Sequence, residues 1–125
     1  MSKKIISTDK APAAIGPYSQ AVEAGGFVYA SGQIPIDPAT GNIPEGIEAQ
    51  AKQALTNVKN LIEAAGLTLD NVVKTSVFIK NMADFAKVNE IYATFFTKDY
   101  PARSCVEVSA LPKGVLIEVE VVAAK

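Results

Sequence analysis

The apolar residues that follow Ile47 recur at steps of three and four, and this spacing restricts the possible folds more than any other feature of the chain. The stripe consists of Ile47, Ala51, Ala54, Leu55, Val58, Leu61, Ile62 and Ala65. Such a period predicts a helix with one buried face. Gly66 follows directly and is expected to cap the C-terminus of this helix. The rest of the chain must therefore supply an apolar layer for the helix to cover.

Segments rich in β-branched and aromatic residues are expected to form that layer as strands. These segments are 18–24, 27–34, 72–80, 103–109 and 115–123. Gly25 and Gly26 separate the first two and predict a tight hairpin. The pair 103–109 and 115–123 is separated by the turn Ala110 to Gly114. The sheet should thus contain both neighbouring hairpin strands and strands that are joined through helices.

A second helix is expected between the strands 72–80 and 103–109. Its apolar residues run at helical spacing from Phe85 to Phe96, Asn81 is a predicted N-cap, and Pro101 excludes further helix. The element order predicts a single domain over 1–125 with an α+β fold, in which a mixed sheet carries both helices on one face. Because two helices cover one face only, the other needs polar side chains or a partner subunit, and we expect a closed cyclic oligomer.

Composition excludes several kinds of chemistry and of partner. The chain has no histidine and one cysteine, so a Ser-His-Asp triad, a Cys-His pair and the usual His/Cys zinc site are ruled out. Twelve basic and thirteen acidic residues give a net charge of -1 without a basic stripe, which argues against a nucleic-acid partner. No apolar run reaches membrane-spanning length, and a single cysteine with no signal-like N-terminus predicts a cytoplasmic protein.

Two strands carry the most plausible functional side chains. The alternation of strand residues places Arg103 and Cys105 on one face, and it places Glu118 and Glu120 on one face of the last strand. Arg103 could hold an anionic substrate through its planar fork, and a partly buried glutamate could act as a general acid or base. The alternative is that these are solvated strand faces with an incidental cross-strand ion pair. Cys105 has no histidine to activate it and is equally consistent with a buried, unreactive thiol.

Four further residues are weaker candidates, each with a structural alternative. Tyr18 could donate a hydrogen bond or simply pack near a turn. Gly32, next to Ser31, could let a ligand approach the backbone or mark a bulge. Asn89 lies among apolar positions of the second predicted helix and could be merely exposed. None of these residues identifies a function by itself.

Taken together, five ordered blocks resemble the Rid family of reactive-intermediate deaminases, in its 2-iminobutanoate/2-iminopropanoate deaminase branch. The blocks are Ile15–Val22, Ser31–Gly41, Gln53–Gly66, Val72–Phe85 and Pro101–Glu120. The resemblance covers essentially the whole chain. It implies a chorismate-mutase-like fold assembled as a homotrimer, with active sites in clefts between subunits, and no metal or organic cofactor.

The resemblance also implies a role for each candidate residue. Arg103 matches the arginine that holds the substrate carboxylate, and Glu118 matches the glutamate that positions or activates water. The positions expected to line the cleft are Tyr18, Ser31, Gly32, Asn89 and Cys105. Relatives can carry threonine in place of Cys105, which argues against a required thiol nucleophile.

The activity implied is hydrolysis of reactive 2-imino acids, released as enamines by pyridoxal-phosphate dehydratases, to 2-keto acids and ammonia. Such an activity would protect other pyridoxal-phosphate enzymes. Two alternatives remain open at this point. One is a non-enzymatic module that binds small carboxylates with a regulatory or chaperone-like role, and the other is RNA cleavage or translation inhibition.

Overall fold

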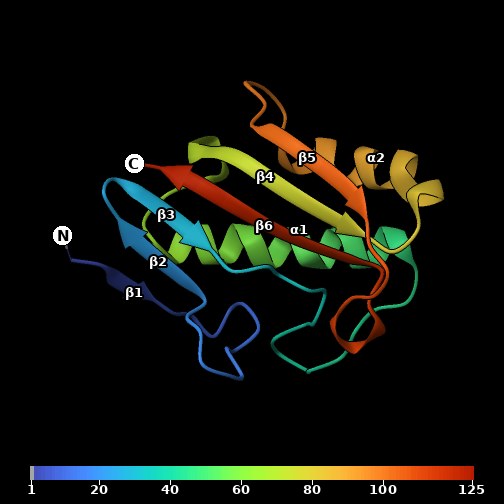
Figure 1. Ribbon diagram of the computed structural model, residues 1–125, viewed down its shortest axis with the longest axis horizontal. Coiled ribbons are helices and arrows are strands. Elements are labelled where there is room, and N and C mark those ends of the chain that lie inside the picture. Colours follow the sequence, from blue (N-terminus) through green and yellow to red (C-terminus); the bar gives the residue numbers. More distant parts are fainter. Residues whose placement is uncertain (1) are drawn as a thin grey trace.

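A six-stranded mixed sheet forms one layer of the protein and two helices form the other, in a computed structural model that describes residues 2–125 (Figure 1). The strands are β1 Lys4–Ile6, β2 Ala21–Ala24, β3 Phe27–Ala30, β4 Val72–Ile79, β5 Ala102–Glu107 and β6 Ile117–Ala124. The helices are α1 Ile47–Ala64 and α2 Phe85–Phe95, with 3₁₀ turns η1 Leu69–Asn71, η2 Met82–Asp84 and η3 Pro112–Gly114. The predicted α+β architecture is confirmed, and β1 is an additional short strand.

The order of strands across the sheet is β1-β2-β3-β6-β4-β5. All neighbours are antiparallel except β4 and β5, which are parallel. A parallel pair needs a crossover, and α2 provides it between these two strands. Strand β4 therefore lies between β5 and β6, although β5 and β6 follow each other in the chain.

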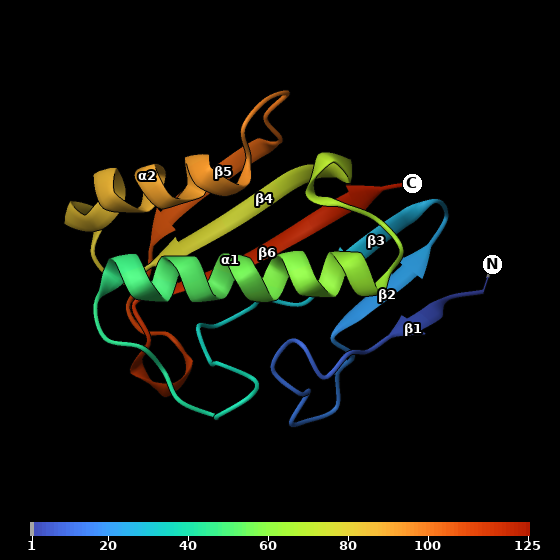
Figure 2. The ribbon, with the colours of Figure 1, turned by 180° about the vertical axis from the view of Figure 1, so that it is seen from behind.

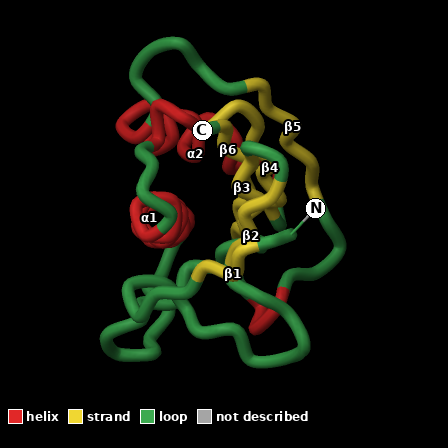
Figure 3. Tube along the Cα trace, turned by 90° about the vertical axis from the view of Figure 1, so that its left-hand side faces the viewer, coloured by secondary structure: helices red, strands yellow, loops and turns green. Residues whose placement is uncertain are grey.

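Both helices lie on the same side of the sheet, as the view from behind and the view along the sheet show (Figures 2 and 3). Helix α1 buries the predicted stripe, and Gly66 ends it with a φ of 83°. The Leu67 amide donates to the Ile62 carbonyl at 3.2 Å and the Gly66 amide to the Glu63 carbonyl at 2.9 Å, which is a Schellman motif. Asn81 is the N-cap of the turn η2, which leads directly into α2, but its side chain makes no capping hydrogen bond.

The hairpin and the start of the following segment are only partly as expected. Gly25 and Gly26 have φ values of 59° and 84°, the left-handed conformation that a type I′ turn requires. Strand β3, however, ends at Ala30 rather than continuing to Ile34. Gln33 rejoins the sheet by a single bridge to Val119. The two residues between leave the ladder, which brings the backbone of Gly32 toward β6.

Alternation along β6 defines the two faces of the sheet. Ile117, Val119 and Val121 are at most 2% exposed because they lie under the helices. Glu118 and Glu120 point to the opposite face, which no helix covers (Figure 3). Large apolar side chains are also exposed on this open face, namely Ile5, Phe27, Tyr29 and Val106.

No helix within residues 2–125 combines the length and the apolar character needed to cross a membrane.

Candidate functional site

Six of the seven predicted site residues line two different cavities of one chain, and Cys105 lines neither of them. A cavity of about 330 Å³ is lined by Tyr18, Ser31, Gly32 and Glu118, among others. A second cavity of about 440 Å³ contains Arg103 and Asn89. We call the first the glutamate half-site and the second the arginine half-site.

In the glutamate half-site, the backbone of Gly32 provides the surface on which the Glu118 side chain rests. A Cβ atom built on Gly32 would overlap Oε2 of Glu118 and lie only 2.8 Å from its Cδ. Glycine is therefore required here by close approach, and the early end of β3 is what creates that approach. The weak sequence signal at Gly32 thus has a specific physical cause, the position of a carboxylate.

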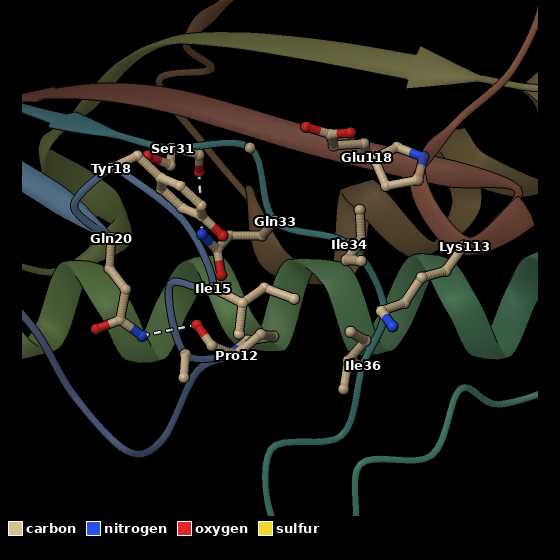
Figure 4. A pocket seen from close by; sticks show the side chains of 13 residues that line it. Pro12, Ile15, Tyr18, Gln20, Ser31, Gln33, Ile34, Ile36, Lys113 and Glu118 are labelled. Carbon is tan, nitrogen blue, oxygen red and sulfur yellow. Dashed lines mark hydrogen bonds between the residues drawn. The ribbon is translucent and has the colours of Figure 1, made fainter.

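Ser31 and Tyr18 form the opposite side of the same cavity (Figure 4). The Ser31 hydroxyl donates to the Ser19 carbonyl at 2.6 Å, which ties the loop before β2 to the segment after β3. The preceding loop is fixed by Gln20, whose amide nitrogen contacts three backbone carbonyls including that of Pro12 at 2.8 Å. Tyr18 is held on this ordered loop with half of its surface exposed. Its phenol is thus available to a ligand.

The carboxyl group of Glu118 has an environment suited to proton transfer. Partial burial raises the pKa of Glu118 above its ordinary value, and the like charge of Glu120 on the same face raises it further. No ion pair in the described residues involves Glu118. A carboxyl group whose pKa is shifted toward neutrality and whose charge is not neutralised can accept a proton and return it during a reaction.

In the arginine half-site, helix α2 holds the guanidinium of Arg103 with neutral groups. Nη1 of Arg103 donates to Oδ1 of Asn89 at 2.8 Å. The Cζ atom lies 4.8 Å from the ring centroid of Tyr92 and 5.4 Å from that of Phe85. Phe85, Asn89 and Tyr92 occupy positions i, i+4 and i+7 of α2 and so share one helix face.

The charge of Arg103 has no acidic partner in the described part of the chain. Within residues 2–125 the single ion pair joins Lys125 to Glu23, far from this helix in the fold. An ordered guanidinium with free N–H groups and no carboxylate beside it is a binding site for a small anion. Partial burial raises the pKa of the neighbouring Cys105 thiol, and the Arg103 charge offsets only part of that effect. The thiol form of Cys105 is thus favoured over the thiolate that a nucleophile needs.

Within one chain the two half-sites face opposite sides of the sheet. Arg103 pairs in register with Thr75 of β4, and this pair lies on the face that the helices cover. Glu118 pairs with Phe78 of β4, which pairs in turn with Val106 of β5, and these three residues lie on the open face. Arg103 is exposed, as the alternative of a solvated strand face has it, but at this edge the face meets α2, which contacts the guanidinium. The alternative of a cross-strand ion pair is wrong, since the strand β4 separates the two residues.

Three residues near the half-sites were not among the predicted site residues. Tyr92 contacts Arg103, and its position three residues after Asn89, on the same face of the predicted helix, could have indicated this. Lys113 lines the glutamate half-site in the turn η3. Gln33 is 4% exposed and donates to the Ser31 carbonyl at 3.0 Å, while its Oε1 atom has no partner in the described residues. Within residues 2–125 no cluster of acidic or cysteine side chains could hold a metal ion.

Comparison with known proteins places this chain and its fold in one family. The family model described as Endoribonuclease L-PSP matches residues 8–125. The chain is 55% identical to the 2-iminobutanoate/2-iminopropanoate deaminase of Salmonella typhimurium, over 98% of each protein. The solved structure of E. coli TdcF with bound serine has a TM-score of 0.95 and 49% identity, with 98% of each chain covered.

A further similar structure belongs to a protein described as a member of the Rid family. YyfA from Yersinia pestis, a protein of the conserved Rid family, has a TM-score of 0.97 and 52% identity, with 99% of this chain and 100% of that chain covered. The protein is therefore an α+β protein of the class that the L-PSP model describes. Within that class, the chain belongs to the Rid family, and the resemblance seen in the sequence is confirmed.

Proposed function

We propose that this protein is a deaminase that hydrolyses reactive 2-imino acids to 2-keto acids and ammonia. The observation that carries the proposal is the pair of complementary half-sites, an unpaired guanidinium that suits a carboxylate and a partly buried carboxyl group that suits proton transfer. The name of the Salmonella relative agrees with this chemistry. The serine bound by TdcF supports a site for a ligand of the size of an amino acid.

We further propose that a complete active site forms between two copies of the chain, in a homotrimer. The half-sites lie on opposite faces, so one copy would contribute Arg103, Cys105 and Asn89, and the next copy Tyr18, Ser31, Gly32 and Glu118. Contact between two different surfaces is heterologous, and such contacts form a ring when the rotation between copies closes. The open sheet face supports this assembly because it exposes large apolar side chains, including Tyr29 at 50% and Val106 at 46%.

The mechanism follows from the two charged groups. Arg103 binds the substrate carboxylate, which places the imine carbon near a water molecule that Glu118 orients. Glu118 accepts a proton from water as the water oxygen bonds to that carbon, and it returns this proton to the imine nitrogen to give a carbinolamine. The amino group then takes up a proton from solvent, and Glu118 accepts the hydroxyl proton as the C–N bond breaks, so that ammonia leaves and the keto group forms. Glu118 then releases that proton to solvent. No bond to the protein forms, so Cys105 serves only as part of the wall.

One assay tests the proposal directly. A threonine dehydratase generates the 2-imino acid, and the rate of its decay is followed with and without the purified protein. The wild type should accelerate the decay, and Arg103→Ala should abolish the acceleration while leaving the assembly intact. Cys105→Ser is the matched control, because it changes the same strand face without removing the carboxylate anchor, and it should keep most of the activity.

The same assay separates the alternative function. Wild-type protein that binds 2-oxobutanoate but does not accelerate imine decay would be a carboxylate-binding module rather than an enzyme. Full activity of Arg103→Ala would reject the assigned anchor.

A further inference from the structure

We propose that Tyr92 of α2 is a positioning residue for Arg103, and that its ring holds the guanidinium in the orientation that binds a carboxylate. This inference rests on the proposed role of Arg103 as the substrate anchor. It concerns a residue that touches Arg103 and that is not itself expected to touch the substrate carboxylate.

The first step is the contact between the ring and the guanidinium. The Cζ atom of Arg103 is 4.8 Å from the Tyr92 ring centroid, well within the range of a cation–π interaction. Arg103 comes from an edge strand and is exposed, so its long side chain would otherwise sample many rotamers. A ring beneath the guanidinium reduces that freedom before the ligand arrives, which reduces the entropy lost on binding.

The second step is that the ring is itself held in place. Tyr92 is 7% exposed, and its hydroxyl lies 2.9 Å from Oγ1 of the fully buried Thr75. Thr75 is the direct neighbour of Arg103 in the parallel β4–β5 register, so Tyr92 bridges from the core to the guanidinium. The Phe96 ring packs against Tyr92 with centroids 4.7 Å apart. These contacts restrict the position of the Tyr92 ring.

The third step is that the three side chains in contact with the guanidinium, those of Asn89, Tyr92 and Phe85, are neutral. Burial raises the pKa of the Tyr92 hydroxyl, an effect only partly offset by the Thr75 hydrogen bond and the Arg103 charge, so the phenol stays protonated. Asn89 accepts from one nitrogen as an amide rather than as a carboxylate. The guanidinium is thus ordered without being neutralised, and its remaining N–H groups are free for a bidentate contact.

The test measures the affinity of the assembled protein for 2-oxobutanoate by titration calorimetry, together with the thermal unfolding temperature. Tyr92→Leu removes the ring and should weaken binding about tenfold. Tyr92→Phe keeps the ring but leaves Thr75 without its partner, so it should lower the unfolding temperature and keep the Kd within about twofold.

Two further variants control for general loss of packing. Phe96→Leu removes a buried ring that packs against Tyr92, while the cation–π contacts of Arg103 with Tyr92 and Phe85 remain, so it should lower the unfolding temperature and weaken binding clearly less than Tyr92→Leu does. Phe85→Leu removes the more distant ring over Arg103 and should weaken binding in the same direction but less, by about threefold. If Tyr92→Leu does not assemble, Phe85→Leu and Tyr92→Phe still test the ring contact.

An unchanged Kd in assembled Tyr92→Leu would overturn the inference, and so would an equal loss of affinity in Phe96→Leu. In the imine assay, Tyr92→Leu should raise KM more than it lowers kcat, because binding of the carboxylate is what weakens. Absence of imine hydrolysis by the wild type would refute the proposed function alone, since the binding comparison needs no turnover.

Discussion

Arg103→Ala and Glu118→Gln disable different half-sites, and in a ring of copies these two defects can complement each other. Each variant alone has every site defective, because every site needs one arginine half and one glutamate half. In a mixed ring, the chain with Glu118→Gln still contributes an intact arginine half. The chain with Arg103→Ala still contributes an intact glutamate half. A site that receives both intact halves should be active.

The size of the effect follows from the geometry. When the two variants are co-expressed in equal amounts and assemble at random, each half of a site is intact with a probability of about one half, so about a quarter of the sites are active. The mixed protein should therefore show about a quarter of the wild-type rate of imine decay. The matched control is a mixture of the two variants that were assembled separately, which should stay inactive as long as the copies do not exchange.

The result would refute the reasoning if the co-expressed protein were folded and mixed but no more active than either variant alone. That outcome would mean that both halves of a site come from one chain, in an arrangement different from the one described here. Light scattering on the same samples measures the oligomeric state. A monomer with full activity would contradict the proposed assembly independently of the complementation.

Three further substitutions probe individual contacts. Asn89→Asp places a carboxylate beside the Arg103 guanidinium, where it competes with the substrate, and should raise KM by up to about tenfold in the imine assay; an unchanged KM would contradict the need for a neutral acceptor. Glu120→Gln removes the like charge that helps to raise the pKa of Glu118, so the acidic limb of the pH profile of kcat/KM should move to lower pH. An acidic limb that stays at the same pH or moves to higher pH would argue against Glu118 as the titrating group. Gly32→Ala should lower kcat about a hundredfold because the new methyl group displaces the Glu118 carboxylate, and normal kcat would show that its position is not critical.

Local patterns in the sequence predicted the layers of the fold well. The stripe from Ile47 onward and the glycine after it determine α1 and its end, because helical periodicity and left-handed caps act over a few residues. The alternation in β6 likewise separates Glu118 from its buried neighbours without reference to other strands. The stretch after Ala30 was less predictable, because its position beside Glu118 and its single bridge to Val119 are contacts with the distant strand β6.

The grouping of the site residues could not be predicted in the same way. The sequence indicated Arg103 and Glu118 as partners on consecutive strands, and side-chain alternation gave each its own face correctly. It could not show that β4 pairs between them, because strand order depends on contacts between residues far apart in the chain. The contact of Tyr92 with Thr75 and Arg103 is of the same kind, since it joins a helix to two strands.

The sequence by itself therefore determined which side chains are buried, where the helices lie and which residues can carry charge into a site, because periodicity and residue chemistry are local properties. Only the tertiary structure decided that Arg103 turns toward α2 while Glu118 turns to the open face. The physical reason is the crossover through α2, which makes β5 a parallel edge strand next to β4 and moves it away from β6. That single topological choice separates the two charged groups within one chain.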